Sequence, residues 1–148
     1  MKVTLLGAGK LKPAQRRLVT AAVLQGLGAR RRRRGELCLA LVTDRGIRSL
    51  NRRFLGQDRP TDVIAFPYPE SGPGAAAPSD ESPFGDIAVS LGAVRRQSRA
   101  LGHPPFKELL TLAAHGALHL AGYDDGRAAD RERMFRRQER IVASLFKA

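Results

Sequence analysis

Apolar positions along the chain fall into two patterns, short continuous runs typical of strands and longer segments with helical spacing. Four runs are of the β type, and each predicts a strand. The first is short, which favours an edge position. The third and fourth are expected to be neighbouring core strands of one sheet. These runs span residues 3–6, 36–43, 61–67 and 85–90.

Five other segments repeat apolar side chains at helical spacing and predict helices. Asp44 is placed to cap the second helix, and the sequence His-Pro-Pro breaks the chain before the fourth, which puts His103 in an exposed turn. The fourth helix is apolar around most of its circumference, so we expect it to be central and buried. The predicted helices span residues 13–27, the segment between Asp44 and Gly56, 91–101, 106–121 and 127–146.

Length and composition favour one domain over residues 1–148, because 43% hydrophobic residues support a single core. Residues 68–84 are rich in Pro, Gly, Ala and Ser and predict an exposed, flexible loop. No apolar run approaches the roughly 20 residues that cross a bilayer, and the N-terminal apolar stretch is too short for a secretory signal. We therefore expect a cytoplasmic protein without membrane association. Cys38 is the only cysteine, which excludes an internal disulfide, and is expected to be buried in a strand.

The segment HGALHLAGYDD, residues 115–125, is the strongest candidate site. His115 and His119 are one helical turn apart, so both imidazoles can aim at one point. Gly122 is placed to end the helix and turn the chain back, which makes Asp125 a candidate third ligand. Two nitrogens and one carboxylate oxygen, with a fourth position for water, are typical of a catalytic zinc site. The same spacing also occurs by chance on helix faces, where histidines are hydrogen-bonded boundary residues.

The formal net charge of +12 points to a polyanionic partner. Arginine dominates the excess and forms the run Arg30 to Arg34. Its planar guanidinium suits phosphate groups, so such a surface is expected to bind RNA or DNA in a salt-dependent way. The alternatives are a coding bias and a solvated loop.

Three segments resemble the YbeY-type endoribonucleases, a bacterial family associated with ribosomal RNA maturation and 70S ribosome quality control. The resemblance covers residues 36–146. It implies an α/β (α+β) single-domain fold in which a small mixed sheet packs with four to five helices, the central buried helix carrying the metal-binding histidines. It also implies one zinc ion per chain, hydrolysis of single-stranded RNA, processing of the 3′ end of 16S rRNA and association with the small ribosomal subunit. The segments are Leu50-Asn51 through QDRPTDVIAFP at residues 57–67, then Gly85-Asp86-Ile87, then HGALHLAGYD at residues 115–124.

Two positions depart from the family pattern. The pattern ends Gly-Tyr-Asp-His, with that histidine as third zinc ligand, whereas this chain has Asp125 there. Zinc accepts carboxylate oxygen, but a carboxylate lowers the net charge of the centre, so Mn²⁺ or another divalent ion becomes competitive. The arginine that the family carries after Asn-x-x-Tyr/Phe is Leu55 here. Arg52, Arg53 and Arg59 either supply that charge from nearby or are ordinary surface arginines.

The leading hypothesis is a hydrolase in which His115, His119 and Asp125 hold a divalent ion that activates a bound water against a phosphodiester. Arg59 is the candidate contact to the phosphate in the transition state, and Asp124 is expected to orient a ligand or the turn. The alternative is a catalytically weak assembly factor that binds RNA or ribosomes with a structural metal, which Leu55 favours. A hydrolase acting on a small or peptide substrate is a third hypothesis.

Gly116 argues against a metalloprotease, because the protease motif has at that position a Glu that acts as general base. The net charge also favours a polyanion over a peptide. Asp62 and Asp86 follow or precede strand runs, where they either line a cleft or end the strands, and for Asp86 we favour the structural role.

Overall fold

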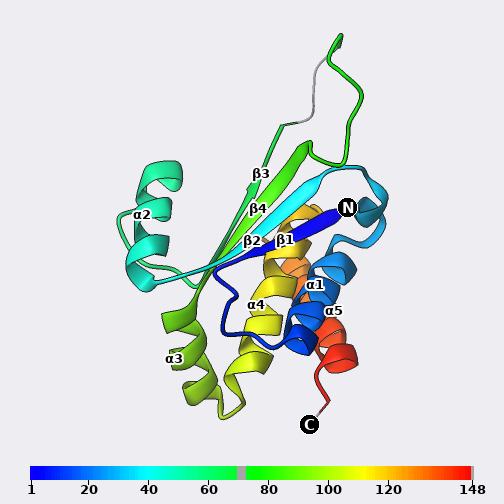
Figure 1. The fold of residues 1–148 in the computed structure, drawn as a ribbon. Coiled ribbons are helices and arrows are strands. Elements are labelled where there is room, and N and C mark those ends of the chain that lie inside the picture. The colour runs from blue at the N-terminus through cyan, green and yellow to red at the C-terminus, as the bar shows by residue number, and fades with distance from the viewer. Residues whose placement is uncertain (70–72, 148) are drawn as a thin grey trace.

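A four-stranded mixed sheet in the order β1-β2-β4-β3 forms the centre of the computed structural model, which describes residues 1–69 and 73–147 (Figure 1). β1 pairs with β2 and β2 with β4 in parallel, and β3 pairs with β4 antiparallel. The described elements are β1 (Lys2–Leu6), α1 (Pro13–Leu27), the 3₁₀ helix η1 (Gly28–Arg32), β2 (Glu36–Val42), α2 (Asp44–Leu55), β3 (Val63–Pro67), β4 (Pro83–Ser90), α3 (Leu91–Leu101), α4 (Pro105–Leu120) and α5 (Ala128–Leu145).

This architecture confirms the expected α/β single-domain fold with a small mixed sheet. β1 lies at one edge as predicted, and β3 and β4 are neighbours as predicted. β3 occupies the other edge, whereas the sequence suggested a core strand. Its apolar residues are explained by the helices on both of its faces, since α4 packs against one and α2 against the other.

The main core lies between the sheet and one layer of helices. Figure 1 shows α1, α4 and α5 together on one side of the sheet and α2 on the other. Alternate residues of β2 and β4 point into the main core, including Leu37, Leu39, Ile87 and Val89.

Cys38 points to the opposite face of the sheet. It is half-buried rather than buried, and this burial raises the pKa of its thiol. α2 covers a smaller cluster of Ile47, Ile64 and Ala88.

α4 is the central helix, as predicted, and it approaches its neighbours at two glycines. A Cβ on Gly26 of α1 would lie 2.6 Å from the Cβ of Ala117 in α4. A Cβ on Gly116 of α4 would lie 2.8 Å from Cγ2 of Ile87 in the sheet. Glycine therefore lets α4 fit closely between α1 and the sheet, which fixes the position of the two histidines.

α2 begins one residue earlier than a cap at Asp44 would require. Thr43 is the N-cap, and its side chain accepts a hydrogen bond from the Gly46 amide at 3.0 Å. Asp44 instead joins α2 to α3, because it accepts hydrogen bonds from Arg96 and from Ser90, the N-cap of α3, at 2.7 Å each. The Arg96 guanidinium and the Ser90 hydroxyl lower the pKa of Asp44 to about 2.

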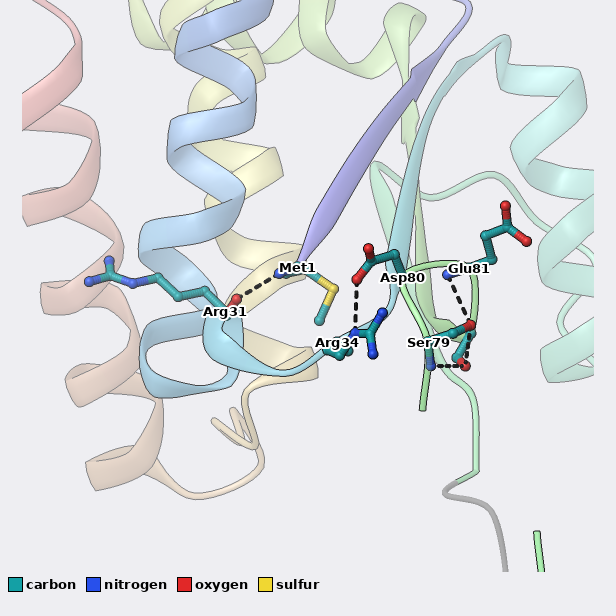
Figure 2. A network of polar contacts seen from close by, with 7 residues as sticks. Met1, Arg31, Arg34, Ser79, Asp80 and Glu81 are labelled. Carbon is teal, nitrogen blue, oxygen red and sulfur yellow. Dashed lines mark hydrogen bonds and ion pairs between the residues drawn. The ribbon is translucent and has the colours of Figure 1, made fainter. Parts of the chain in front are cut away.

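The arginine run and the segment between β3 and β4 meet at one end of the sheet (Figure 2). Arg34 pairs with Asp80 at 3.1 Å, and the amino group of Met1 donates to the carbonyl of Arg31 at 2.9 Å. β4 begins at Pro83, so the predicted loop 68–84 gives its last two residues to the strand. Residues 70–72 of that loop lie outside the described residues.

None of the helices within residues 1–69 and 73–147 is long and apolar enough to span a bilayer.

Candidate metal centre

A polar stripe runs along the otherwise buried helix α4. After Phe106, the residues of this described helix that retain solvent exposure are Lys107, Thr111, His115 and His119. They are four residues apart, so they lie on one face of the helix. The two histidines therefore occur at the one surface that α4 leaves open.

The two imidazoles and one carboxylate converge at the end of this stripe. Nε2 of His115 and Nε2 of His119 are 3.0 Å apart, and Oδ2 of Asp125 is 3.7 Å from Nε2 of His119. The ligand atoms of all three residues lie within 4.8 Å of one another. A tetrahedral ion with bonds of roughly 2.0–2.1 Å places two ligand atoms about 3.3 Å apart. The donor set and its spacing therefore fit a divalent ion such as zinc.

The turn after α4 brings Asp125 back to the histidines. The Tyr123 amide donates to the carbonyl of Leu118, and the Gly122 amide donates to that of His119, each at 3.0 Å. These two bonds form a Schellman motif, which requires a left-handed residue, and Gly122 has φ of +99°. The expected role of Gly122 is thus explained by backbone geometry. Asp124 accepts a hydrogen bond from the Gly126 amide at 2.9 Å and so shapes the same turn.

Gln138 of α5 sets the protonation pattern of His115. Its Oε1 is 2.8 Å from Nδ1 of His115, and the residue is only 8% exposed. An amide oxygen can only accept, so Nδ1 carries the proton and Nε2 keeps its lone pair. That lone pair points toward His119, which is the arrangement that a metal-binding histidine needs.

The burial of His119 favours the uncharged form of its imidazole, which is the form that binds a cation. Burial lowers the pKa of His119 and the nearby His115 lowers it further, while Asp125 acts in the opposite direction. The lowered pKa favours the neutral imidazole, whose nitrogen can act as a ligand. The centre therefore combines neutral nitrogen donors with one anionic oxygen.

A cleft of about 330 Å³ begins at His115 and follows the stripe toward Lys107, between α3, α4 and α5. We call it the His115 cleft. Asp62 lines it and accepts a hydrogen bond from Nε2 of Gln97 at 3.1 Å. Asp86 lies on the outer face of the sheet, where it accepts a hydrogen bond from the Tyr68 hydroxyl at 2.6 Å. Asp62 thus lines the cleft, whereas Asp86, for which we favoured a structural role, does not.

His103 is not an exposed turn residue, in contrast to the expectation from the two prolines. Its Nε2 lies 2.8 Å from Oε2 of Glu108, whose side chain is only 4% exposed. Both residues line the His115 cleft. The correction has a simple cause, since a carboxylate buried on the first turn of α4 needs a partner, and His103 lies five residues before it.

Arg59 lies in the loop between α2 and β3, three residues before Asp62. Its backbone carbonyl accepts a hydrogen bond from Asn51 at 2.9 Å, but its guanidinium forms no hydrogen bond or ion pair with the described residues. It is exposed and does not line the His115 cleft. The structure therefore does not join Arg59 to the three candidate ligands. Leu55, where the family pattern has arginine, is 54% exposed at the end of α2.

Part of the arginine run has a structural role. Nη1 of Arg30 donates to the carbonyl of Leu120 at the end of α4 at 2.9 Å, and Arg33 lies over the ring of Phe84. All five arginines remain exposed. The run is therefore neither a simple solvated loop nor, from its contacts alone, an assigned nucleic-acid site.

Sequence reasoning missed Gln138 and Glu108. Each is a polar residue at a position where the helix otherwise buries apolar side chains. Gln138 falls in line with Met134, Ile141 and Val142, and Glu108 adjoins Leu109 and Leu110. A buried polar residue in such a series was the available signal.

A mixed sheet covered by helices, with a His-x-x-x-His helix facing a carboxylate, defines a single-domain α/β protein with a candidate metal centre. The family model described as Endoribonuclease YbeY matches residues 10–146, and the chain belongs to this family. The resemblance seen from residue 36 onward is confirmed and extends to residue 10. Membership supports a nuclease role of the hydrolase class.

Individual relatives cover most of the chain. The Endoribonuclease YbeY of Moorella thermoacetica is 39% identical over 143 residues, covering 95% of this chain and 89% of that protein. That of Limosilactobacillus fermentum is 40% identical over 145 residues, covering 93% and 91%. Among solved structures, the solution structure of a Thermotoga maritima protein superimposes with a TM-score of 0.60 at 30% identity, covering 97% of this chain and 88% of that one.

Proposed function

We propose that the protein is a metal-dependent endoribonuclease that cuts single-stranded RNA. The observation that carries the proposal is the convergence of Nε2 of His115, Nε2 of His119 and Oδ2 of Asp125, with buried Gln138 holding the proton of His115 on the far nitrogen. A divalent ion bound there would polarise a phosphodiester and lower the pKa of a bound water. Family membership supports RNA as the substrate.

The residues of the chain have separate tasks in this proposal. His115 and His119 hold the ion as neutral imidazoles, and Asp125 holds it as a carboxylate. Gln138 orients His115. The guanidinium of Arg59, which has no hydrogen bond or ion pair within residues 1–69 and 73–147, is available to contact the phosphate and to stabilise negative charge in the transition state. We propose one zinc ion per chain, with Mn²⁺ as the competing ion because of Asp125.

The biological substrate is proposed from the resemblance to the family. We propose ribosomal RNA, including the 3′ end of 16S rRNA, and a role in ribosome quality control with the small ribosomal subunit in the cytoplasm. The net charge of +12 supports a polyanionic partner of this kind. Sedimentation of the protein with purified small subunits at low salt, and its release at high salt, is the expected result. Sedimentation that is absent at low salt would contradict this partner.

Metal content tests the site directly. We expect about one ion per chain in protein purified without chelator or nickel resin, and loss of that ion in Asp125→Ala. Asp124→Ala is the matched control. It removes the neighbouring carboxylate, which bonds the Gly126 amide and is not one of the three candidate ligands, so we expect this variant to keep the ion. Retention of both metal and RNA cleavage by Asp125→Ala or His119→Ala would show that the site is misplaced.

Leu55 supports a second candidate function, a catalytically weak assembly factor in which the metal is structural. An exposed leucine cannot contact phosphate as the family arginine would. The two functions differ in one assay, cleavage of single-stranded RNA with and without chelator. Chelator-sensitive cleavage supports the nuclease, and salt-sensitive RNA binding without cleavage supports the assembly factor.

A further inference from the structure

We propose that the His115 cleft binds one unstacked nucleobase of the RNA, and that Phe135 is the side chain on which this base stacks. The inference rests on the proposed function, because it names what lies beside the phosphate at the candidate metal centre. His115 belongs to both the metal centre and the cleft. A group held in the cleft therefore adjoins whatever the three candidate ligands hold.

The charge of the cleft excludes phosphate and suits a base. Three carboxylates line it, those of Asp62, Glu108 and Glu139, against the single ammonium of Lys107. The charged side chains of the cleft are thus mostly acidic, whereas the whole chain has a net charge of +12. A phosphate would be repelled by such walls, whereas the N–H groups of a base edge can donate to carboxylate oxygens.

The acceptors in the cleft are held in place before any ligand arrives. Glu108 is fixed by His103 at 2.8 Å, and Asp62 by Gln97 at 3.1 Å. The cleft volume of about 330 Å³ is at the lower end of the roughly 300–1,000 Å³ range of small-molecule pockets. Preorganised acceptors in a cleft of this size fit one base rather than a longer stretch of RNA.

Two exposed apolar side chains line the cleft beside its carboxylates. Phe135 of α5 is 58% exposed and Leu101 of α3 is 66% exposed, and both line the cleft. Single exposed apolar residues are ordinary, but two that line one cleft give a flat apolar ligand a surface to cover. An aromatic ring beside hydrogen-bond acceptors is how proteins bind unpaired bases.

A basic groove continues from the cleft across α5. It has a volume of about 630 Å³ and shares Phe135 and Glu139 with the cleft. Its arginines can follow the phosphates of a strand whose base turns into the cleft at Phe135. They are Arg133, Arg136, Arg137 and Arg140.

The test is RNA binding measured in chelator at low salt, so that it does not depend on cleavage. The probes are labelled hexaadenylate and a hexamer in which every ribose is abasic. We expect Phe135→Ala to weaken binding of hexaadenylate by about 5- to 160-fold, the range of one base–aromatic stack. The variant should bind the abasic hexamer as the wild type does, because the missing base and the missing ring remove the same contact.

Two further variants control for folding and for general loss of apolar surface. Phe135→Trp should keep the wild-type preference for hexaadenylate over the abasic hexamer. Phe54→Ala should bind both probes as the wild type does, since Phe54 is also 58% exposed but does not line the cleft. An equal effect of Phe135→Ala on both probes, no effect on either, or no measurable binding of hexaadenylate by the wild type would each overturn the inference.

Failure of the proposed function would look different. Metal content reports on the metal centre alone. We expect Phe135→Ala to keep it at the wild-type level. If the wild type lacks metal-dependent cleavage but shows the Phe135-dependent preference for hexaadenylate, the nuclease proposal fails while the base pocket stands.

Discussion

Gln138 decides which nitrogen of His115 faces the candidate metal centre, although it lies 23 residues further along the chain. A histidine without such a partner divides its proton between two nitrogens and rotates more freely. Partners of this kind commonly change metal affinity by about 10- to 100-fold. The ligand set alone therefore does not describe the site.

Replacement of Gln138 should weaken metal binding without removing a ligand. We expect Gln138→Leu, which keeps the volume and the burial, to lower zinc affinity by about 10- to 100-fold in competition with a chromophoric chelator. Gln97→Leu is the matched control, because Gln97 lines the same cleft but bonds Asp62. Equal affinities for wild type and Gln138→Leu would contradict the role assigned to Gln138.

Asp44 predicts a defined pH dependence of stability. Its hydrogen bonds with Arg96 and Ser90 lower the pKa of the carboxyl to about 2 in the folded protein, against about 3.9 in an unfolded chain. The folded state thus favours the ionised form, and the resulting stabilisation is complete above about pH 4 and is lost as the pH falls toward about 2. We expect the difference in free energy of unfolding between wild type and Asp44→Asn to shrink across this window in urea titrations. A difference that stays constant would show that Asp44 contributes nothing through its charge.

The helices and strands show what a sequence can predict. Periodicity located α1, α3, α4 and α5 within one or two residues, because α1, α3 and α5 each bury one apolar face and α4 buries all but one narrow stripe. The N-cap of α2 was assigned to Asp44 instead of Thr43 because both residue types cap helices, and only the backbone shows which one does. The 3₁₀ helix η1 had no apolar pattern to reveal it.

The candidate site was predictable only in part, because some of its contacts join segments that are distant in the sequence. The spacing of His115 and His119 and the glycine after them are local features, so the motif indicated a site from sequence alone. Gln138 and Glu108 depend on which helices pack together. That information appears only when α5 docks on α4 and when the turn holding His103 folds over the first turn of α4. The spacing of residues along the chain does not show which helices pack together.

The contact between α1 and α4 predicts a destabilising effect of a single methyl group. We expect Gly26→Ala to lower the free energy of unfolding by about 1–2 kcal/mol, because overpacking costs about 1–3 kcal/mol and exceeds the helical gain of up to about 1 kcal/mol. The new Cβ would lie 2.6 Å from that of Ala117, which has no rotamer to move to.

A double variant and a control sharpen this test. Adding Ala117→Gly should recover part of the loss, since it removes the clashing atom. Gly9→Ala should be close to neutral, because, its two chain neighbours aside, no atom of the described residues lies within 4 Å of the position of its Cβ. Urea denaturation measures all four proteins, and a Gly26→Ala variant as stable as the wild type would mean that the helices separate at little cost.

The whole molecule combines a basic surface with an acidic cleft at the candidate centre. This division lets arginines attract an RNA strand while the cleft admits only an uncharged part of it. Association should then depend strongly on salt, whereas the choice of base should not. In this proposal the net charge of +12 attracts the RNA and the cleft selects the base.

Salt dependence can locate the surface that contacts phosphate. We expect the slope of log affinity against log salt for single-stranded RNA to decrease by about 1.4 in the double variant Arg136→Gln, Arg140→Gln, or about 0.7 for each lost phosphate contact. Arg16→Gln with Arg17→Gln on α1 carries the same change in net charge away from the α5 groove. An equal decrease in both double variants would show that only the overall charge matters.

The four-residue repeat of the stripe on α4 also limits how the length of this helix can change. Deleting one residue between Lys107 and His115 would rotate everything beyond it by about 100°, and the histidines would turn toward the core. Relatives should therefore accept insertions or deletions in the loops around α4 but not within the stretch from Lys107 to His119. The helix thereby fixes a distance within the cleft, because the seven steps from Glu108 to His115 separate these two lining residues by about 10 Å along the helix axis.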